Sequence, residues 1–268
     1  ILIYFISLLP DDSMLKNYKP DVMTRIHASN GVLVKEYSKE YRIFVPIDYI
    51  PENLKNAFIS AEDKNFYYHY GVDPKGILRA FLKNTYYLFS DRRPEGASTI
   101  TQQVAKNFLL SDELSITRKV KEALLAIKID ATLSKSRILE LYLNQIYLGS
   151  GTYGVAAASN RYFKKSLEEL DLSEISFLAA LPKAPSRYNP KKNYDKSFER
   201  RNWVLKRMYI NNYITKNDYD FFVKKPIDIL ASINKPIYSS DYYLEEIRKQ
   251  IIKIYGEDFL YGGGLSVK

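Results

Sequence analysis

The stretch SKSRILELYLNQIYLGSGTYG, residues 134–154, decides between a helical fold and a nucleotide-binding α/β fold. Its first part, through Leu148, has the apolar content and the length of a helix. Its last six residues, Gly149 to Gly154, fit the G-x-G-x-x-G pattern that binds phosphate in dinucleotide folds. That pattern has to follow a strand, whereas here it follows a predicted helix. We therefore predict a tight glycine turn with close backbone packing, and no nucleotide site.

Helical segments continue on both sides of this stretch. Pro51 suits a first helical position, and an apolar stripe carries that helix to about Glu62. Further helices are predicted after Asp73, from Thr99 through Phe108 with Gln102 completing a capping box, from Ser115 to Leu133, and in LDLSEISFLAALP, where Asp171 caps and Glu174 reaches back. The fold class expected is therefore mainly α.

Two of these helices carry distinctive apolar patterns. The helix after Asp73 has correctly spaced apolar residues at Ile77, Leu78, Phe81 and Leu82. In the helix from Ser115 to Leu133, apolar residues occupy more than one face, which predicts that it is mostly buried. One face there holds Val120, Leu124, Ile127 and Ala131, and the others hold Leu125, Ala126 and Ile129.

The two ends of the chain differ from this helical centre. Residues 20–48 alternate and are rich in β-branched and aromatic types, with Ser29, Asn30 and Gly31 at a turn, which predicts a small N-terminal hairpin. The apolar stretch ILIYFISLLP, residues 1–10, has about half the length of a spanning helix. We interpret it as the end of a trimmed membrane anchor, with a buried strand as the alternative. The expected segments are then 1–10, a β and linker segment 11–48, a main domain 49–215, and a C-terminal linker 216–268.

Composition limits the partners and the chemistry. A hydrophobic fraction of 46% and a charged fraction of 26% are those of a globular protein. A net charge of +9 predicts an anionic partner, and 24 tyrosines suit a surface that is partly apolar and partly wet, as at a membrane boundary. The chain has no cysteine and only two histidines, His27 and His69, which excludes disulfides and thiolate sites and makes zinc unexpected.

Chemistry must then rest on carboxylates, lysine and arginine. Two-carboxylate chemistry at a sugar is the natural candidate, with Glu62 and Glu122 on separate helices. Glu62 is expected at a helix C-terminus, where the helix dipole raises a carboxylate pKa and makes the group a better proton acceptor. Arg118 and Glu122 share a helix face at four-residue spacing, for which a surface salt bridge is the simple explanation.

The order of the motifs adds a family resemblance. EDKNFYYHYG, GASTITQQ, RKVKE, KSRILELYLNQIYLGSGTYG and LAALPKAPSRYNP follow one another as in the peptidoglycan glycosyltransferase half of class A penicillin-binding proteins, which the chain resembles from about Ile43 to Ile214. The flanking segments are similar to the 1A type. The resemblance implies a lysozyme-like helical domain at 49–215 with a small membrane-associated lobe, and a linker at 216–268 leading to a transpeptidase domain.

It also implies a reaction and roles for residues. Family members polymerise lipid II: the acceptor 4-hydroxyl attacks the donor's anomeric carbon with inversion, and undecaprenyl pyrophosphate leaves. Glu62 matches the general base, and Glu122 matches a second acidic residue on the pyrophosphate side, where a divalent cation, Mg or Mn, is an expected cofactor; no metal ligand set is certain and no organic cofactor is expected. The residues expected to bind substrate are Arg79, Ser98, Thr99, Gln102, Gln103, Lys106, Arg118 and Lys119.

Other motif residues are expected to shape the site without touching the reacting atoms. They are Asp63, Phe66, His69, Gly71, Tyr142 and Asn144. The loop at Ser90 to Glu95 corresponds to a mobile flap over the donor site. The chain departs from the family pattern in RYFKK, where Lys164 stands in place of a common glycine and puts a local turn in doubt.

The expected partners are lipid II, the growing glycan, membrane lipids and the chain's own downstream transpeptidase domain, with no nucleic acid. The expected location is the outer, periplasmic face of the bacterial inner membrane, with a single anchor. One alternative is a lysozyme-like glycan hydrolase or lytic enzyme, which would have no use for the cations of RKVKE. The other is a non-catalytic, basic, membrane-tethered binding module, which predicts basic residues spread along one face and no dependence on Glu62.

Overall fold

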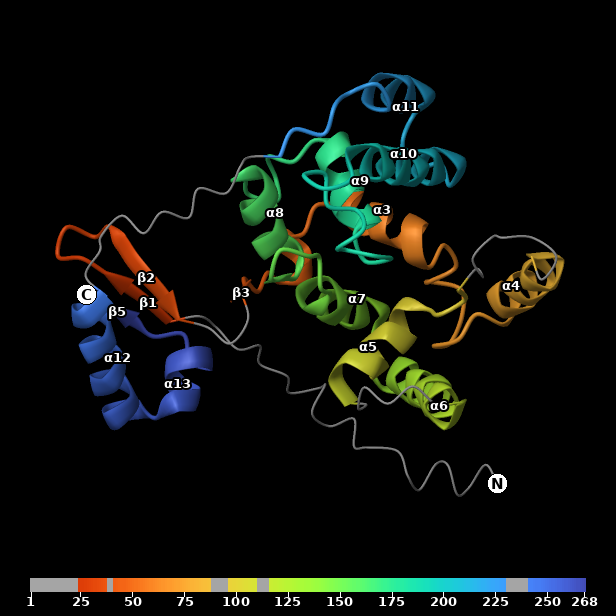
Figure 1. The fold of residues 1–268 in the computed structure, drawn as a ribbon. Coiled ribbons are helices and arrows are strands. Elements are labelled where there is room, and N and C mark those ends of the chain that lie inside the picture. Colours follow the sequence, from red (N-terminus) through yellow and green to blue (C-terminus); the bar gives the residue numbers. More distant parts are fainter. Residues whose placement is uncertain (1–23, 38–40, 88–95, 110–115, 230–240) are drawn as a thin grey trace.

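A computed structural model describes residues 24–37, 41–87, 96–109, 116–229 and 241–268. The predicted anchor at residues 1–10 and the predicted flap at Ser90 to Glu95 lie outside these described residues. The structure confirms the mainly α class (Figure 1). Its helices are α3 (Glu52–Glu62), α4 (Pro74–Tyr87), α5 (Ile100–Leu109), α6 (Ile116–Thr132), α7 (Lys135–Gln145), α8 (Val155–Phe163), α9 (Leu172–Ala180), α10 (Tyr194–Ile210), α11 (Lys216–Phe222), α12 (Asp241–Tyr255) and α13 (Glu257–Gly262).

The strands are short. β1 (Thr24–His27) and β2 (Leu33–Tyr37) form the predicted antiparallel hairpin, whose turn includes Gly31 at φ 83°. β3 (Tyr41–Arg42) pairs in parallel with β4 (Thr152–Tyr153), and β5 (Ser266–Val267) pairs in parallel with β1. A 3₁₀ turn, η1 (Ile47–Tyr49), precedes α3.

The main core gathers the helices around α9. Helices α3, α9 and α10 pack against one another, and α5 packs on α6 and α7. The start of α9 follows the sequence closely: the Asp171 side chain accepts from the Glu174 N–H, and the Glu174 carboxylate accepts from the Asp171 N–H. Both hydrogen bonds of the predicted capping box therefore form, and they satisfy N–H groups that the helix itself leaves unpaired.

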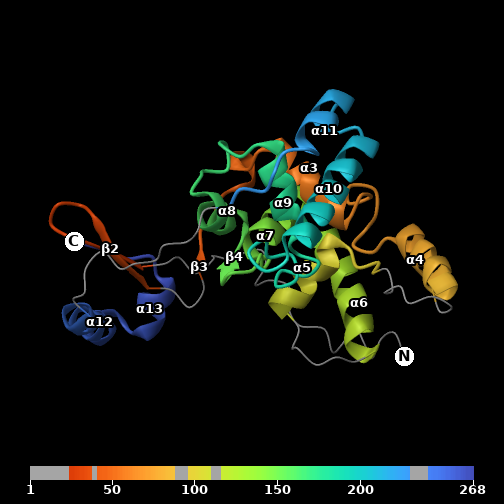
Figure 2. The same cartoon turned by 45° about the horizontal axis from the view of Figure 1, so that its top comes forward.

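Helix α4 stands apart from this core, at the right of Figure 1, and it stays at the edge of the molecule in the turned view of Figure 2. Its predicted apolar stripe is exposed: Ile77, Leu78, Phe81 and Leu82 are 46 to 63% accessible. Close by in the sequence, Tyr68 and Tyr70 are also exposed. The spacing thus predicted the helix, but its apolar face meets no core in the described part of the chain.

Helix α6 corrects one expectation. It is not mostly buried, because Val120 and Ile127, on one of its predicted apolar faces, are exposed. The face that packs inward holds Leu125, Ala126 and Ile129. Apolar residues lie on more than one face of this helix, but only one face is buried. The spacing of the apolar residues therefore could not show which face packs against the core.

The glycine stretch from Gly149 to Gly154 forms the predicted tight turn. Gly149, Gly151 and Gly154 all have positive φ, between 73° and 85°. A Cβ at Gly154 would lie 2.7 Å from the Asn144 carbonyl oxygen, which shows the expected close backbone packing. Lys164, at the end of α8, has φ 57° and ψ 34°, so the turn that suits glycine forms with lysine in a left-handed conformation.

A second, small hydrophobic cluster joins the two ends of the described chain. Ile26 from β1 packs with Leu244, Ile251 and Leu260 from α12 and α13, beside the sheet with strand order β2-β1-β5. This unit lies at the left in both Figure 1 and Figure 2, away from α4. Within the described ranges, we find no helix with both the length and the apolar character needed to cross a bilayer.

Candidate active site

Glu62 is the last residue of α3, as predicted, and its side chain is partly buried. The Gln103 side-chain amide donates a hydrogen bond of 2.9 Å to its Oε2 atom. Burial raises the pKa of the Glu62 carboxyl above its ordinary value, and the Gln103 hydrogen bond opposes this rise only in part. The predicted direction is confirmed, but the main cause is desolvation and not the helix dipole.

Two cations that were not among the predicted site residues also act on Glu62. They are Arg200 from α10 and Lys183 from the segment after α9, and their charges lower the pKa of Glu62, while the neighbouring Asp63 raises it. The Arg200 guanidinium lies over the Trp203 ring at 3.8 Å from its centroid. Lys183 stands inside the quoted motif LAALPKAPSRYNP, so that motif was a usable signal, whereas Arg200 resembles many other basic residues of its helix.

Glu122 forms a second charged group on α6. Its side chain is buried, with 2% of the residue accessible. Lys119 Nζ lies 2.6 Å from Glu122 Oε2, and Arg118 Nε lies 3.2 Å from Glu122 Oε1. A surface salt bridge therefore does not describe this group. The Glu122 carboxylate is buried, whereas the Lys119 side chain remains largely accessible.

The segment 98–103 joins the two carboxylate groups. At one end Lys119 Nζ donates to Ser98 Oγ at 2.8 Å, and at the other end Gln103 donates to Glu62. Between them, Thr99 and Gln102 form the predicted capping box: the Thr99 N–H donates to Gln102 Oε1, and the Gln102 N–H donates to Thr99 Oγ1. Ser98 and Gln103 thus contact the charged groups, while Thr99 and Gln102 are buried at the helix start.

Asp63 fixes this segment to the end of α3. Its Oδ2 atom accepts from the Ile100 N–H at 3.0 Å, and both of its oxygens lie within 3.0 Å of His69 Nε2. Asp63 and His69 are both buried. Lys135 then donates to the His69 carbonyl oxygen at 2.6 Å and lies over the buried Phe66 ring. These residues shape the site through packing and hydrogen bonds.

Gly71 and Asn144 have backbone roles. Gly71 has φ 79°, and a Cβ there would lie 2.3 Å from the Ala126 carbonyl oxygen, so α6 rests directly on this glycine. Asn144 donates to the Val45 carbonyl oxygen and accepts from the Val45 N–H, both at 2.8 Å. The side chain therefore holds the segment before α3 against α7 and satisfies both backbone polar groups of Val45.

Tyr142 is a buried residue of α7. Its ring packs edge to face on Phe58 of α3, with 6.1 Å between the ring centroids. The remaining predicted residues, Arg79 and Lys106, are exposed on α4 and α5. Arg79 acts electrostatically on Asp73, which caps α4, and its predicted contact with substrate stays a prediction.

The matching family model is described as Transglycosylase and covers residues 30–209. The chain belongs to the transglycosylase family. The resemblance drawn from the motifs is thereby confirmed, and so is the helical fold class.

Relatives of this transglycosylase chain carry the name penicillin-binding protein 1A. That of Rickettsia bellii is 48% identical over 268 residues, covering 100% of this chain and 34% of that protein. That of Aquifex aeolicus is 44% identical, with 100% and 36% covered, and that of Escherichia coli is 44% identical, with 93% and 29% covered. The chain therefore spans about a third of the length of these curated relatives.

A solved structure agrees with this assignment. The crystal structure of penicillin-binding protein 1A from Haemophilus influenzae matches with a TM-score of 0.54 and 29% sequence identity, over 92% of this chain and 26% of that one. The transglycosylase fold described above is thus shared with a protein of that type.

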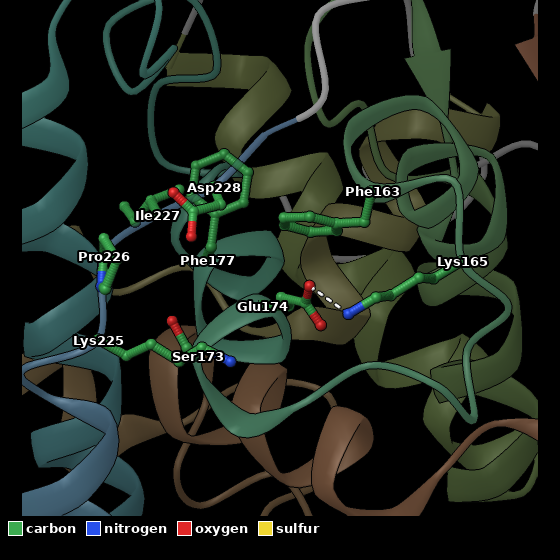
Figure 3. A pocket seen from close by; sticks show the side chains of 9 residues that line it. All are labelled: Phe163, Lys165, Ser173, Glu174, Phe177, Lys225, Pro226, Ile227 and Asp228. Carbon is green, nitrogen blue, oxygen red and sulfur yellow. Dashed lines mark hydrogen bonds and ion pairs between the residues drawn. The ribbon is translucent and has the colours of Figure 1, made fainter.

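Two hollows in the described part of this transglycosylase lie elsewhere. One, of about 320 Å³, is lined by residues of α8, of the segment that follows it, of α9 and of the segment after α11, including Phe177, Lys165 and Glu174 (Figure 3). The other, of about 520 Å³, lies between the segment before α3 and the end of α8. Neither is lined by Glu62 or Glu122, so the candidate active site is defined by its charged groups and not by either hollow.

Proposed function

We propose that the chain polymerises lipid II into glycan strands for bacterial cell-wall synthesis. In this reaction the acceptor 4-hydroxyl oxygen forms a bond to the anomeric carbon of the donor, from the face opposite the leaving group. The bond from that carbon to the pyrophosphate oxygen breaks, and undecaprenyl pyrophosphate leaves with the electron pair. The hydroxyl proton passes to a protein base. Family membership supports this reaction class, and the Glu62 site carries the assignment of the base.

Glu62 has the properties of that base. A carboxylate whose pKa is raised by burial accepts a proton near neutral pH better than an exposed one. Gln103 occupies its Oε2 atom and fixes the orientation of the carboxylate. We therefore propose that Glu62 is the base that accepts the proton of the acceptor hydroxyl.

The charged group around Glu122 is suited to stabilise the leaving pyrophosphate. Arg118 and Lys119 are held in place by the buried Glu122 carboxylate, and Lys119 is accessible enough to reach a ligand. Cations fixed in advance stabilise charge that develops on a departing pyrophosphate, because no reorganisation is needed during the reaction. This convergence on one carboxylate favours an enzyme over a binding module with basic residues spread along a face.

A resident divalent cation does not fit the described residues. Both Glu122 oxygens face cations, and among the described residues no cluster of three or more His, Cys, Asp or Glu is placed to hold a metal ion. In the proposed reaction, Arg118 and Lys119 supply the positive charge beside the pyrophosphate without a protein-bound metal. We still propose that the reaction requires Mg or Mn in solution.

We also propose that α4 meets the outer face of the bacterial membrane. Its exposed stripe, from Ile77 to Leu82, is apolar, and the chain is basic overall. An apolar helix face beside positive charge suits a surface of anionic lipid. The double substitution Leu78→Glu with Phe81→Glu should reduce co-sedimentation with anionic vesicles, and equal binding of both proteins would remove this assignment.

The decisive experiment measures polymerisation of labelled lipid II, in detergent with a divalent cation, by the unmodified chain and by Glu62→Gln. Glu52→Gln is the matched control, because Glu52 lies at the other end of α3 and pairs with Lys55 at the surface. We expect polymer from the chain and from the control, and none from Glu62→Gln. Equal polymer from all three would exclude Glu62 as the base. Cleavage of preformed glycan without polymerisation would support the hydrolase.

A further inference from the structure

The Tyr142 hydroxyl is a buried polar group that the proposed reaction does not yet use. Only 1% of Tyr142 is accessible, and its hydroxyl has no hydrogen-bond partner among the described residues. Leaving such a group unpaired costs free energy, so buried hydroxyls in folded proteins nearly always have a protein or water partner.

The surroundings of the ring identify the groups that could accept a hydrogen bond from this hydroxyl. Phe58, on which the Tyr142 ring packs, precedes Glu62 by one helical turn on α3. The two groups that act most strongly on the hydroxyl by charge are the carboxylates of Glu62 and Asp63. Asp63 is already engaged by His69 and by the Ile100 N–H, whereas Glu62 has one described hydrogen bond, from Gln103 to Oε2.

We propose that Tyr142 is a positioning residue, whose hydroxyl donates a hydrogen bond through one bound water molecule to the Glu62 carboxylate. This proposal rests on the assignment of Glu62 as the base. A water that bridges two polar groups is nearly as favourable as a direct hydrogen bond. Gln103 from α5 and Tyr142 from α7 would then hold the carboxylate from two helices and leave an oxygen for the acceptor hydroxyl.

The phenol has the right form for this role. Burial and the two negative carboxylates raise the pKa of Tyr142 well above its ordinary value, so it stays a neutral hydroxyl and a donor at working pH. Donation to the charged form of Glu62 lowers the pKa of that carboxyl. The other groups that face Glu62 are Arg200, Lys183 and Asp63, and none of them is changed by substituting Tyr142.

The test replaces Tyr142 by phenylalanine, with Tyr162→Phe as the matched control. Tyr162 is also buried, and its hydroxyl donates to the Leu148 carbonyl oxygen at 2.9 Å, a partner outside the site. In Tyr142→Phe, Glu62 loses one hydrogen-bond donor. The acid limb of the profile of polymerisation rate against pH should then move by about 0.5 to 1 pH unit toward higher pH. Tyr162→Phe should leave this limb unchanged, and an unmoved limb in both variants would overturn the proposal.

A second measurement keeps the outcome independent of activity. Carbon-13 NMR titration of the Glu62 carboxyl, identified through Glu62→Gln, should show a higher pKa in Tyr142→Phe than in the unmodified chain. Thermal unfolding of Tyr142→Phe gives a further test. If the hydroxyl is hydrogen-bonded, as we propose, its loss lowers the melting temperature by a few degrees; if it is unpaired, its removal raises the melting temperature. If the chain fails to polymerise lipid II but the titration and melting results hold, the proposed function and the positioning role fail, and only the hydrogen bond from Tyr142 to Glu62 stands.

Discussion

The hydrogen bond from Gln103 to Glu62 makes a quantitative prediction about the pH dependence of the enzyme. Replacing Gln103 by methionine keeps the length and helix preference of the side chain but removes the amide donor, 2.9 Å from Glu62 Oε2. A hydrogen bond to a charged group contributes about 1.5 to 3 kcal/mol. One pKa unit corresponds to about 1.4 kcal/mol. Because both side chains are partly accessible, we take the lower end and expect a rise of about one unit in the pKa of Glu62.

The assay is the initial rate of lipid II polymerisation measured across pH. The proposed reaction uses ionised Glu62 as its base, so a higher pKa of this carboxyl removes activity at the acid side first. The acid limb of the pH–rate profile should therefore move up by about one pH unit while the high-pH plateau is retained. Gln102→Met is the matched control on the same helix: Gln102 caps α5 and does not contact Glu62 in the described structure. It should lower thermal stability and leave the limb in place. An unmoved limb in Gln103→Met would refute our account of how Glu62 is held.

Three further predictions concern charge and backbone, and each is checked by a separate measurement. Lys119→Ala should lower kcat by about 10- to 100-fold, because it removes the cation that we propose stabilises the leaving pyrophosphate; an unchanged kcat would contradict this proposed role. Glu62→Gln should be more stable than the unmodified chain at neutral pH in thermal unfolding: a raised folded pKa makes ionised Glu62 destabilising, so the difference should vanish as pH falls below the unfolded pKa of about 4.3. Gly71→Ala should cost several kcal/mol, because its Cβ would meet the backbone of α6, whereas Gly151→Ala, with similar φ but open space around it, should cost only about 1 kcal/mol; equal melting temperatures would contradict this.

The left-handed residue at the end of α8 gives a stabilising prediction. Lys164→Gly should raise stability by about 1 kcal/mol, because glycine has no Cβ to strain in this conformation. Lys164→Ala is the control, since it removes the long side chain but keeps the strain. Differential scanning calorimetry should show a higher melting temperature for the glycine variant only, and equal values for both would show that the strain is relieved elsewhere.

Local signals predicted the parts of the fold that depend on local chemistry. The capping residues Asp171 and Thr99 mark helix starts because their side chains satisfy N–H groups a few residues away. The end of α3 at Glu62 and the glycine turn before α8 follow from equally short-range rules. These features needed no knowledge of the rest of the chain.

The features that were missed depend on contacts between distant segments. The sequence alone did not show that α6 buries Leu125 and Ile129 and exposes Val120, because that choice depends on where α5 lies. In the same way Arg200 reaches the neighbourhood of Glu62 only through the packing of α10 on α3. The family resemblance supplied Glu62 and Glu122, but the partners that tune Glu62 required the folded structure.

The pairing of β1 with β5 has a consequence for how the chain folds. Leu265 donates its N–H to the Thr24 hydroxyl across a sequence separation of 241 residues, and β1 has β5 as its second neighbour in the sheet. Contacts at such separation form slowly, because a long loop must close before they contribute stability. During synthesis the main helical core can therefore fold while the β1–β2 hairpin still lacks its second neighbour, and the small unit is completed after that core.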